Sequence, residues 1–599
     1  MLSLKFLSLC SVWLLVVLHV PSSSALWPLP ASYESGEGVV WIDRNITFQY
    51  AITNHSSSAL NGTSNLDIAS SYAIVQAAIQ RAQERLLNDT FVPWKFHPRH
   101  SDFEPPTNAT KIFIKNVAIQ QNETDSSAVL KPMAGEVSEN YTLSISTSGN
   151  VAITAISSIG ILRALDTFTQ LFYQHSTNAA IYSPYAPVTI VDAPKFAHRG
   201  LNMDVARNYY PPSFIMHTID VLAWNKFNRL HLHATDAQSW PLDIPALPEL
   251  STKGAYRKGL SYSPQQLADI QEYGMYRGVE VYIEIDMPGH TSVIALAYPE
   301  LIAAYNVQPN WSTYAAEPPS GSLKLNSSGV YDFLHKLWED LLPRVAPYSA
   351  YFHTGGDEVN QNAYNLDDTV RSNQTSVLQP LIQTLVDYNH GYVRAAGMTP
   401  MVWEEMLLNW NLTLGPDVIV QSWLSDESVA ATVRKGHKVL AGNYNYWYLD
   451  CGYGAWVDPP PSATNPYYPY FDYCSPIKNW HLIYSHSPFA SISTTNTSSP
   501  TYVPASSLDL ILGGEVHIWS EKTDPVNFDS VVWPRAAAAA EVLWSGNQDA
   551  NGRNRSLVEV GRRLGVWRER MVERGVGAGV VQMVWCTQDE GGCVADGLG

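Results

Sequence analysis

The sequence predicts an α/β protein in which a (β/α)8 TIM barrel is preceded by a smaller α+β domain. From about residue 197 onward, short apolar strands alternate with helical patterns in the rhythm that such a barrel requires. The residues before that point instead mix alternating strands with two helical segments. A length of 599 residues exceeds one ordinary domain, and a hydrophobic fraction of 45% is enough for a large core.

The first 25 residues have the pattern of a signal peptide. Lys5 precedes the apolar run 6–20, and Pro21 and four small residues follow it, with a cleavage site after about Ala25. The alternatives are a buried helix or a membrane anchor, but fifteen residues are too few to span about 30 Å of hydrocarbon. Thirteen Asn-x-Ser/Thr sequons agree with secretion. We therefore expect a secreted, extracellular glycoprotein.

Residues 26–195 form the predicted N-terminal part. The polar, sequon-rich segment 26–100 is interpreted as a possible pro-segment and the start of the N-terminal domain, and residues 101–195 as its α+β body. The expected helices are 72–87 and 157–172, and the expected strands are 111–117, 141–146 and 151–155.

Residues 196–599 form the predicted catalytic barrel with a C-terminal extension. The eight expected strands are 200–205, 229–234, 280–285, 351–353, 400–403, 418–421, 438–441 and 511–516. Helices are expected between most of them, at 213–225, 263–276, 331–342 and 377–395. A doubly wound open sheet is the rival fold, but no glycine-rich phosphate turn follows the first strand. The long connection 451–508 is typical of a functional loop.

Four cysteines remain once Cys10 is removed with the leader. Their even number suits two disulfide bonds, and three connectivities are open. Local pairing, Cys451–Cys474 and Cys586–Cys593, is the simplest of the three. A zinc site is the alternative, but no C-x-x-C spacing supports it.

The charge balance excludes two classes of partner. There are 37 basic and 55 acidic residues, so the formal net charge is −18. Phosphate backbones and anionic lipid surfaces repel such a chain unless it carries a basic patch. The densest basic stretch, 553–574, is interrupted by three glutamates. We therefore predict no nucleic-acid partner and no membrane partner.

The ends of the predicted strands carry one coherent set of side chains. In a (β/α)8 barrel the active site forms where the strands end. The residues at these ends are Arg207, Asp236, His290, Asp357, Glu358, Trp403, Trp423, Tyr448, Asp450, Trp519 and Glu521. Carboxylates supply acid and base, arginine supplies a fixed cation, and aromatic rings supply the flat apolar faces on which sugars pack.

The run His353-Thr354-Gly355-Gly356-Asp357-Glu358 lies at the centre of this set. Its glycines permit a tight turn that exposes the acidic pair at the barrel mouth. Neighbours on an extended chain point to different sides, which suits poorly the two carboxyls about 5 Å apart of an ordinary retaining glycosidase. One carboxyl is instead expected to protonate the leaving oxygen. The other would orient a 2-acetamido group whose carbonyl oxygen attacks C1.

This run, with 231–240 (His-Leu-His-Ala-Thr-Asp-Ala-Gln-Ser-Trp) and 513–521 (Gly-Gly-Glu-Val-His-Ile-Trp-Ser-Glu), resembles glycoside hydrolase family 20 β-N-acetylhexosaminidases, most of all the secreted fungal enzymes. The resemblance implies that Glu358 is the general acid/base and that Asp357 holds the acetamido nitrogen. It also implies retention of configuration through an oxazolinium intermediate, without a cofactor or metal. The substrates would be chitooligosaccharides and other β-linked N-acetylhexosaminides, cleaved at terminal GlcNAc and GalNAc.

The same resemblance implies roles for the other residues. Arg207 and Glu521 would bind the hydroxyls of the terminal sugar, and Tyr448 and Asp450 would hold the acetamido oxygen and the 6-hydroxyl. The implied acetamido-pocket walls are Trp403, Trp423 and Trp519. Asp236 and His290 would support the acid, and Trp480 would stack on the next sugar. A homodimer and an associated pro-segment are further expectations by analogy. The fungal relatives often have a third disulfide, for which this chain lacks cysteines.

Two rival functions stay open on the sequence alone. A metal-dependent amidohydrolase is suggested by His231 and His233, which share one face of a strand, with Asp236, His290 and His353 nearby. The same residues also serve as hydrogen-bonding supports of a barrel. A secreted lectin would likewise use tryptophan-lined pockets, but it has no use for a positioned proton donor.

Overall fold

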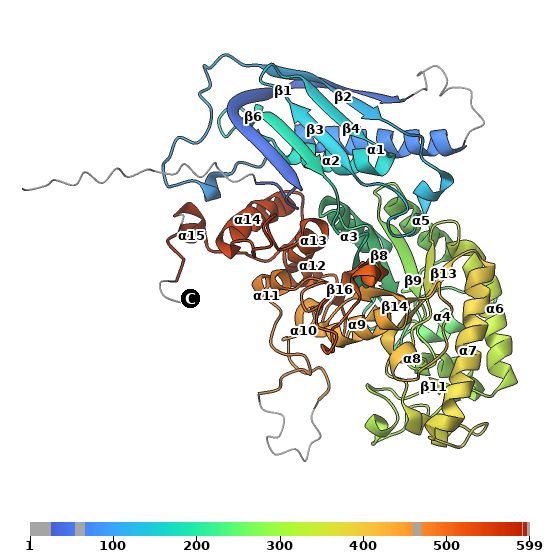
Figure 1. The fold of residues 1–599 in the computed structure, drawn as a ribbon. Helices are drawn as coiled ribbons and strands as arrows, with labels where there is room; N and C mark the ends of the chain where they lie inside the picture. The colour runs from blue at the N-terminus through green and yellow to red at the C-terminus, as the bar shows by residue number, and fades with distance from the viewer. Residues whose placement is uncertain (1–24, 54–65, 459–468, 590, 596–599) are drawn as a thin grey trace, which may run out of the picture.

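The structure is a computed structural model that describes residues 25–53, 66–458, 469–589 and 591–595. The N-terminal domain is a six-stranded sheet of order β1-β2-β4-β3-β6-β5, in which β1 also pairs with β6. Its strands are β1 (Ser32–Ile52), β2 (Phe113–Gln121), β3 (Tyr141–Ile145), β4 (Val151–Ala155), β5 (Tyr173–Gln174) and β6 (Ile181–Asp192). Helices α1 (Leu66–Asn88) and α2 (Ser158–Gln170) lie between this sheet and the rest of the molecule (Figure 1).

Three strands of this sheet were not predicted. The sequence predicts β2, β3, β4 and both helices, but not β1, the two-residue β5 or β6. β1 is 21 residues long, and its pairing register shifts between Ile42 and Thr47 and again between Ser35 and Gly38. Each shift moves the buried side chains out of phase, so the period of two that marks a strand is lost. β1 and α1 both fall within the segment interpreted as a possible pro-segment, whose boundary stays a prediction.

The second domain is a closed barrel of eight parallel strands, as the sequence predicts. Every strand boundary lies within two residues of the expected one. The strands are β7 (His198–Asp204), β8 (Arg229–His233), β9 (Glu280–Glu284), β12 (Tyr351–His353), β13 (Thr399–Trp403), β14 (Ile419–Ser422), β15 (Lys438–Ala441) and β16 (Ile511–Ile518). The prediction succeeds because parallel strands are buried on both faces and appear as short runs rich in apolar residues between helices.

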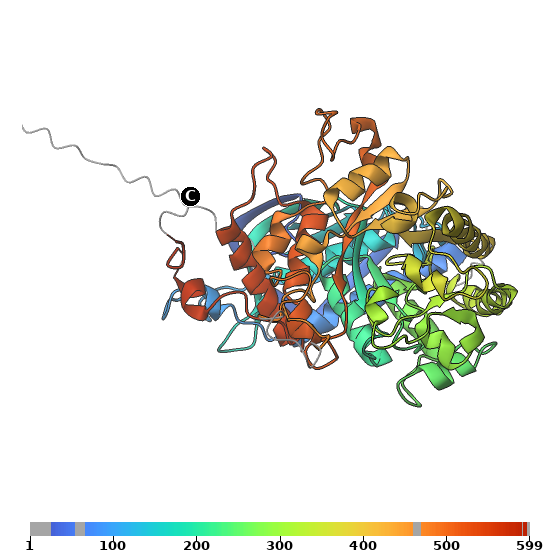
Figure 2. The same ribbon diagram turned by 90° about the horizontal axis from the view of Figure 1, so that it is seen from below.

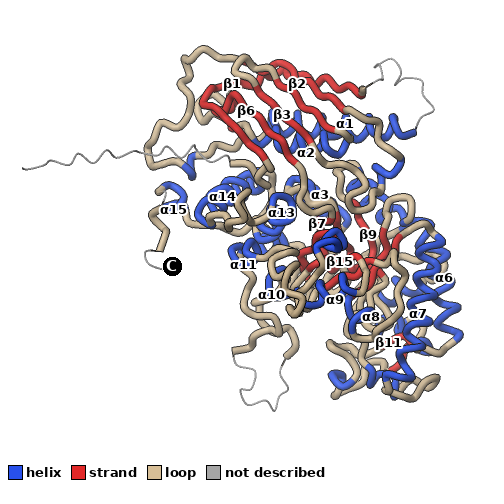
Figure 3. Tube along the Cα trace, in the orientation of Figure 1, coloured by secondary structure: helices blue, strands red, loops and turns tan. Residues whose placement is uncertain are grey.

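Helices surround the barrel on its outer side (Figure 3). The expected helices are present as α3 (Pro212–Trp224), α5 (Pro264–Met275), α6 (Ser328–Val345) and α7 (Thr375–Ala395). The other described helices complete the ring and the C-terminal extension: α4 (Glu249–Gly254), α8 (Glu404–Leu408), α9 (Asp426–Arg434), α10 (Tyr444–Trp447), α11 (Trp480–Ser485), α12 (Phe528–Val532), α13 (Arg535–Ser545), α14 (Leu557–Glu573) and α15 (Val584–Gln588). Within the described ranges, we find no helix with the length and apolarity needed to cross a bilayer.

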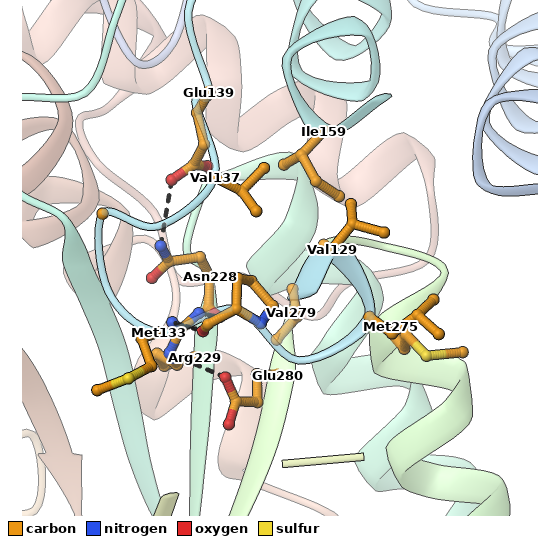
Figure 4. Close-up of a pocket in the computed structure, with 14 residues that line it drawn as sticks. Val129, Met133, Val137, Glu139, Ile159, Asn228, Arg229, Met275, Val279 and Glu280 are labelled. Carbon is orange, nitrogen blue, oxygen red and sulfur yellow. Dashed lines mark hydrogen bonds and ion pairs between the residues drawn. The ribbon is translucent and has the colours of Figure 1, made fainter. Parts of the chain in front are cut away.

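The N-terminal domain sits against the end of the barrel where the strands begin, and it lies behind the barrel in the view from below (Figure 2). Glu139 joins the two units: its carboxylate accepts hydrogen bonds from Arg163 Nε (2.9 Å) and Arg199 Nη2 (2.6 Å). Asn228 Nδ2 donates to the same carboxylate (3.2 Å) beside a small cavity of about 30 Å³ (Figure 4). Arg229 and Glu280, which begin β8 and β9, form an ion pair in the wall of that cavity.

Both expected disulfide bonds are present, Cys451–Cys474 and Cys586–Cys593. The first closes a loop that follows β15 and reaches the open end of the barrel. The second lies in the C-terminal extension. The expected signal peptide lies, apart from Ala25, outside the described residues.

Candidate active site

A cavity of about 450 Å³ opens at the end of the barrel where the strands finish. The side chains that line it come from loops after most of the eight strands, which is where the sequence places the site. Its lining residues are Arg207, His233, Asp236, His290, Ala316, Glu317, Asp357, Glu358, Trp423, Leu424, Tyr444, Tyr448, Trp456, Val457, Tyr473, Trp519 and Glu521. Trp403 and Asp450 lie beside this set, in contact with members of it.

The turn after β12 presents the acidic pair. Gly355 and Gly356 have φ of +69° and +111°, which side chains rarely adopt. A Cβ on Gly355 would lie 1.8 Å from an oxygen of Asp286, so both conformation and space demand glycine there. Glu358 also has a positive φ, +50°. A non-glycine residue held in this region marks a strained, functional turn.

The two carboxyls of the pair have different surroundings. Asp357 is only 9% exposed, whereas the Glu358 side chain is 35% exposed in the cavity. Burial raises the pKa of Asp357, and burial together with the charge of Asp357 raises the pKa of Asp286 well above its ordinary range. Burial thus opposes ionisation of both carboxyls, and it does so more strongly at Asp286. The two neighbouring acids are therefore buried to different extents, and their separate roles stay a prediction.

A chain of imidazoles and carboxylates supports Glu358 from behind. His290 Nε2 lies 3.4 Å from the Glu358 carboxyl, and its Nδ1 lies 3.0 Å from Asp236. Burial opposes the charged form of His290, but Asp236 raises its pKa well above the ordinary value. His290 is therefore an imidazolium that faces the exposed acid. The structure thus brings together Glu358, His290 and Asp236, the three residues that the resemblance places in one relay.

Arg207 lies at the floor of the cavity between three carboxylates. Its Nη1 is 3.0 Å from Asp236 and 3.6 Å from Asp204, and its Nη2 contacts Glu317. The guanidinium also stacks over Trp519 at 5.1 Å. Burial raises the pKa of Glu521, which also lines the cavity, to about 8 although the charge of Arg207 opposes this. A fixed cation with adjacent acceptors is the arrangement that vicinal sugar hydroxyls require.

Aromatic rings close one side of the cavity. Trp403 is fully buried and its Nε1 donates to Glu284 (2.7 Å). Trp423 Nε1 donates to Glu405 (2.8 Å), and its ring is nearly parallel to that of Tyr448 at 6.1 Å. Trp519 lies 6.2 Å from Trp403. The indole N–H groups of Trp403 and Trp423 are both satisfied by carboxylates, so the ring of Trp423, which lines the cavity, can present an apolar face to a ligand.

Asp450 and Trp480, both named from sequence, lie in different places. Trp519 N–H approaches Asp450 Oδ1 at 3.4 Å, so Asp450 lies at the cavity with the others. Trp480 begins α11 and packs against Gly561 of α14, where a Cβ would meet its ring at 3.1 Å. This position corrects the expectation that Trp480 stacks on a second sugar. Trp456 and Tyr473, on the disulfide loop, are the aromatic residues that line the cavity instead.

Sequence reasoning missed several residues of the site. Glu317 lies in the loop between β10 (Ile302–Ala303) and β11 (Ser322–Leu323), which is not a strand end of the barrel. Trp456 and Tyr473 occupy an irregular loop without periodicity. Glu284 is a carboxylate inside an apolar strand, and that anomaly was visible in the sequence as a buried charge needing a partner.

The histidines of the metal interpretation bind carboxylates. His233 contacts Glu284 through Nδ1 (2.6 Å) and Asp236 through Nε2 (2.7 Å), and His231 lies 3.0 Å from Glu284. His231, Glu284 and His353 have ligand atoms close enough to share an ion, but they are fully buried below the cavity. Two further groups with such spacing, Asp236–His290–Glu317 and Asp286–His290–Asp357, share His290 at the cavity. The arrangement fits the interpretation of hydrogen-bonding barrel supports.

Comparisons with known proteins agree with this geometry. The profile described as glycosyl hydrolase family 20, catalytic domain, matches residues 196–547, and one described as beta-acetyl hexosaminidase like matches residues 26–171. A beta-hexosaminidase of Arthroderma benhamiae is 41% identical over 603 residues, covering 95% of this chain and 97% of that protein. The chain belongs to glycoside hydrolase family 20. It is a glycosidase that acts as a β-N-acetylhexosaminidase.

Other relatives of this family 20 enzyme are more distant. A chitooligosaccharidolytic beta-N-acetylglucosaminidase of Ostrinia furnacalis is 31% identical over 488 residues, covering 77% of this chain and 76% of that protein. Among solved structures, a chitobiase of Flavobacterium johnsoniae superposes with a TM-score of 0.69 at 24% identity, covering 92% of this chain and 73% of that one. The second similarity shows the shared two-domain fold.

Proposed function

We propose that this enzyme is secreted and exo-acting, and that it releases terminal non-reducing GlcNAc and GalNAc from chitooligosaccharides and glycoconjugates with retention of configuration. The substrate's own acetamido group would act as the nucleophile. The observation that carries the proposal is the unequal burial of the acidic pair: the Glu358 side chain is open to the cavity, 3.4 Å from His290, whereas Asp357 is enclosed.

In the first step, the acetamido carbonyl oxygen bonds to C1 while the bond from C1 to the leaving oxygen breaks. Glu358 gives its proton to that oxygen, and the sugar becomes a cyclic oxazolinium. Asp357 accepts the amide N–H and balances the positive charge that develops on the ring. In the second step, Glu358 takes a proton from water and the water oxygen bonds to C1. The bond from C1 to the acetamido oxygen breaks, so the oxazolinium ring opens and the β-anomer is released.

The remaining assignments follow from position. Arg207 and Glu521 would bind the hydroxyls at C3 and C4, and Asp450 would bind the 6-hydroxyl. Tyr448 would hold the acetamido oxygen, with Trp403, Trp423 and Trp519 around the methyl group. The chitooligosaccharide class is supported by the insect relative of that name. Extracellular location is supported by the predicted leader and the sequons.

Three measurements test the proposal. An aryl β-N-acetylglucosaminide should be hydrolysed, and NMR should detect the β-anomer of the free sugar first. The matching aryl β-glucoside, which lacks the acetamido group, should not be turned over. A chitotriose labelled at its reducing end should lose unlabelled monosaccharide. The α-anomer first, comparable glucoside turnover, or sugar binding without turnover, as in a lectin, would each contradict the proposal.

A further inference from the structure

Glu284, the last residue of β9, lies directly beneath the floor of the cavity, and its side chain is fully buried. We propose that Glu284 is a positioning residue that fixes the acid relay and the acetamido wall in one mutual arrangement. The inference rests on the proposed function, because it assigns Glu284 to two parts of that mechanism: proton donation by Glu358 and enclosure of the N-acetyl group.

The two oxygens of Glu284 are used by different parts of the site. Oε2 lies 2.6 Å from Nδ1 of His233, and Nε2 of His233 lies 2.7 Å from a carboxylate oxygen of Asp236. Oε1 accepts the indole N–H of Trp403 at 2.7 Å. One carboxylate therefore anchors a residue from β8 and a residue from β13, strands that lie on opposite sides of β9 and β12 in the barrel.

The first arm leads to the proton donor. From Glu284 the contacts run through His233, Asp236 and His290 to Glu358, with separations of 2.6, 2.7, 3.0 and 3.4 Å. Burial alone would favour neutral His233, but Glu284 and Asp236 raise its pKa well above the ordinary value. His233 is thus a cation between two anions, which fixes the position and charge of Asp236 behind His290.

The second arm leads to the acetamido pocket. Trp403 is fully buried, and its ring lies 5.0 Å from His353 and 6.2 Å from Trp519. The hydrogen bond to Glu284 fixes which face of the indole is turned toward the other walls. A carboxylate suits this position better than an amide, because it can only accept, and both arms present donors. Burying an anion here is costly and is offset by these charged and polar partners.

The test exploits the fact that the two arms affect different substrate properties. Rates are measured with aryl N-acetylglucosaminides whose leaving groups differ in acidity, and with N-acetyl and N-propionyl substrates that share one good leaving group. Asp236→Asn should steepen the dependence on leaving group, because it weakens proton donation. Trp403→Phe should reduce the preference for N-acetyl over N-propionyl.

Glu284→Gln should do both at once. The amide keeps the size of the side chain but presents a donor to one arm, so both arms lose their fixed position. We expect a steeper leaving-group dependence, a reduced preference for N-acetyl, and a loss in kcat/KM of up to about 10²-fold on poor leaving groups, as sub-ångström misplacement of reacting groups produces.

A matched control separates positioning from stability. Glu280, at the other end of the same strand, is also a buried carboxylate, and it accepts from Ser349 Oγ (2.8 Å) and Ala350 N–H (2.6 Å). Glu280→Gln should lower the melting temperature while both substrate dependences stay at wild-type values. If Glu284→Gln behaves in the same way, the proposal is overturned.

Glu284→Asp covers the case in which the glutamine variant does not fold. It keeps the charge but withdraws both oxygens by one methylene, so its two substrate dependences should lie between wild type and the expected glutamine values. A folded aspartate variant with wild-type values for both would also overturn the proposal. If the wild type itself hydrolyses no N-acetylglucosaminide, the proposed function fails instead, which is a distinguishable result.

Discussion

The two ends of the barrel both bury charged residues, but they treat them differently. At the end where the strands begin, Glu139 is enclosed by Arg163 and Arg199, and these cations lower its pKa to about 2 in spite of its burial. At the end where the strands finish, burial wins: it raises the pKa of Asp357 and brings that of Glu521 to about 8. The buried charges at the first end therefore stabilise the fold, whereas the carboxyls at the second end are available to bind a ligand.

Buried polar side-chain atoms without a hydrogen-bond partner occur at both ends of the barrel among the described residues. Arg163 Nη1 and Glu280 Oε2 are such atoms at the end where the strands begin, and Asp357 Oδ1 and Glu405 Oε2 are such atoms at the other end. A buried polar group without a partner costs about 1–3 kcal/mol, and the atoms beside the cavity lie where a bound substrate would supply the missing bond.

The largest expected effect at the open end comes from Glu358→Gln. It removes the exposed proton donor, so the rate on substrates with poor leaving groups should fall roughly 10²–10⁴-fold. The loss should shrink as the leaving group becomes more acidic, because such groups depart without a proton. Steady-state kinetics across an aryl series measures both. Because the side chain is partly exposed, the melting temperature should stay near that of the wild type.

An undiminished rate on a poor leaving group would remove Glu358 from its role. A uniform loss across the whole series would instead indicate that the variant disturbs binding rather than proton donation.

The opposite outcome is expected at the closed end, where the strands begin: stability should fall while activity per folded molecule is unchanged. Glu139→Ala leaves Arg163 and Arg199 buried without their counter-ion, and breaking such a pair costs about 3–5 kcal/mol of unfolding free energy. Denaturant unfolding measures the loss, and kcat/KM per folded molecule should be unchanged. A variant of normal stability but reduced kcat would show that this end also acts on catalysis.

Sequence reasoning predicted the open end better than the closed one. Barrel strands, strand-end residues and the Gly-Gly-Asp-Glu turn are local patterns, so Arg207 and Glu358 could be named from their own neighbourhoods. Glu139, Arg163 and Arg199 are far apart in sequence, and only the docking of two domains makes them partners. Trp480 failed for a similar reason: a tryptophan in a long loop has no periodicity to show which surface it packs against.

A smaller effect is expected from pH at the open end. Burial raises the pKa of Glu521 to about 8, so the folded protein binds a proton there that the unfolded chain releases near the ordinary glutamate value. Stability from this group is therefore present at low pH and is lost as the pH rises from about 5 to about 8. At about 1.4 kcal/mol per pH unit, we expect the free energy of unfolding to decline by up to about 4 kcal/mol in that window, and Glu521→Gln should flatten the decline. Chemical denaturation at several pH values measures the difference, and parallel curves for the two proteins would contradict the assignment.

The smallest expected effect comes from Ser263→Ala. This variant compares residues that line the cavity with a residue that only lies at the same end of the barrel. Ser263 caps α5, which starts on the outer ring after the connection from β8: its Oγ accepts from Gln266 N–H (3.2 Å), and Gln266 Oε1 accepts from Ser263 N–H (2.9 Å). Ser263→Ala should cost about 1 kcal/mol of unfolding free energy, as lost caps do. Since the helix start does not line the cavity, kcat/KM and the leaving-group dependence should not change. A kinetic defect in this variant would mean that the outer ring transmits strain to the strand ends, and that the division between the two ends of the barrel is too simple.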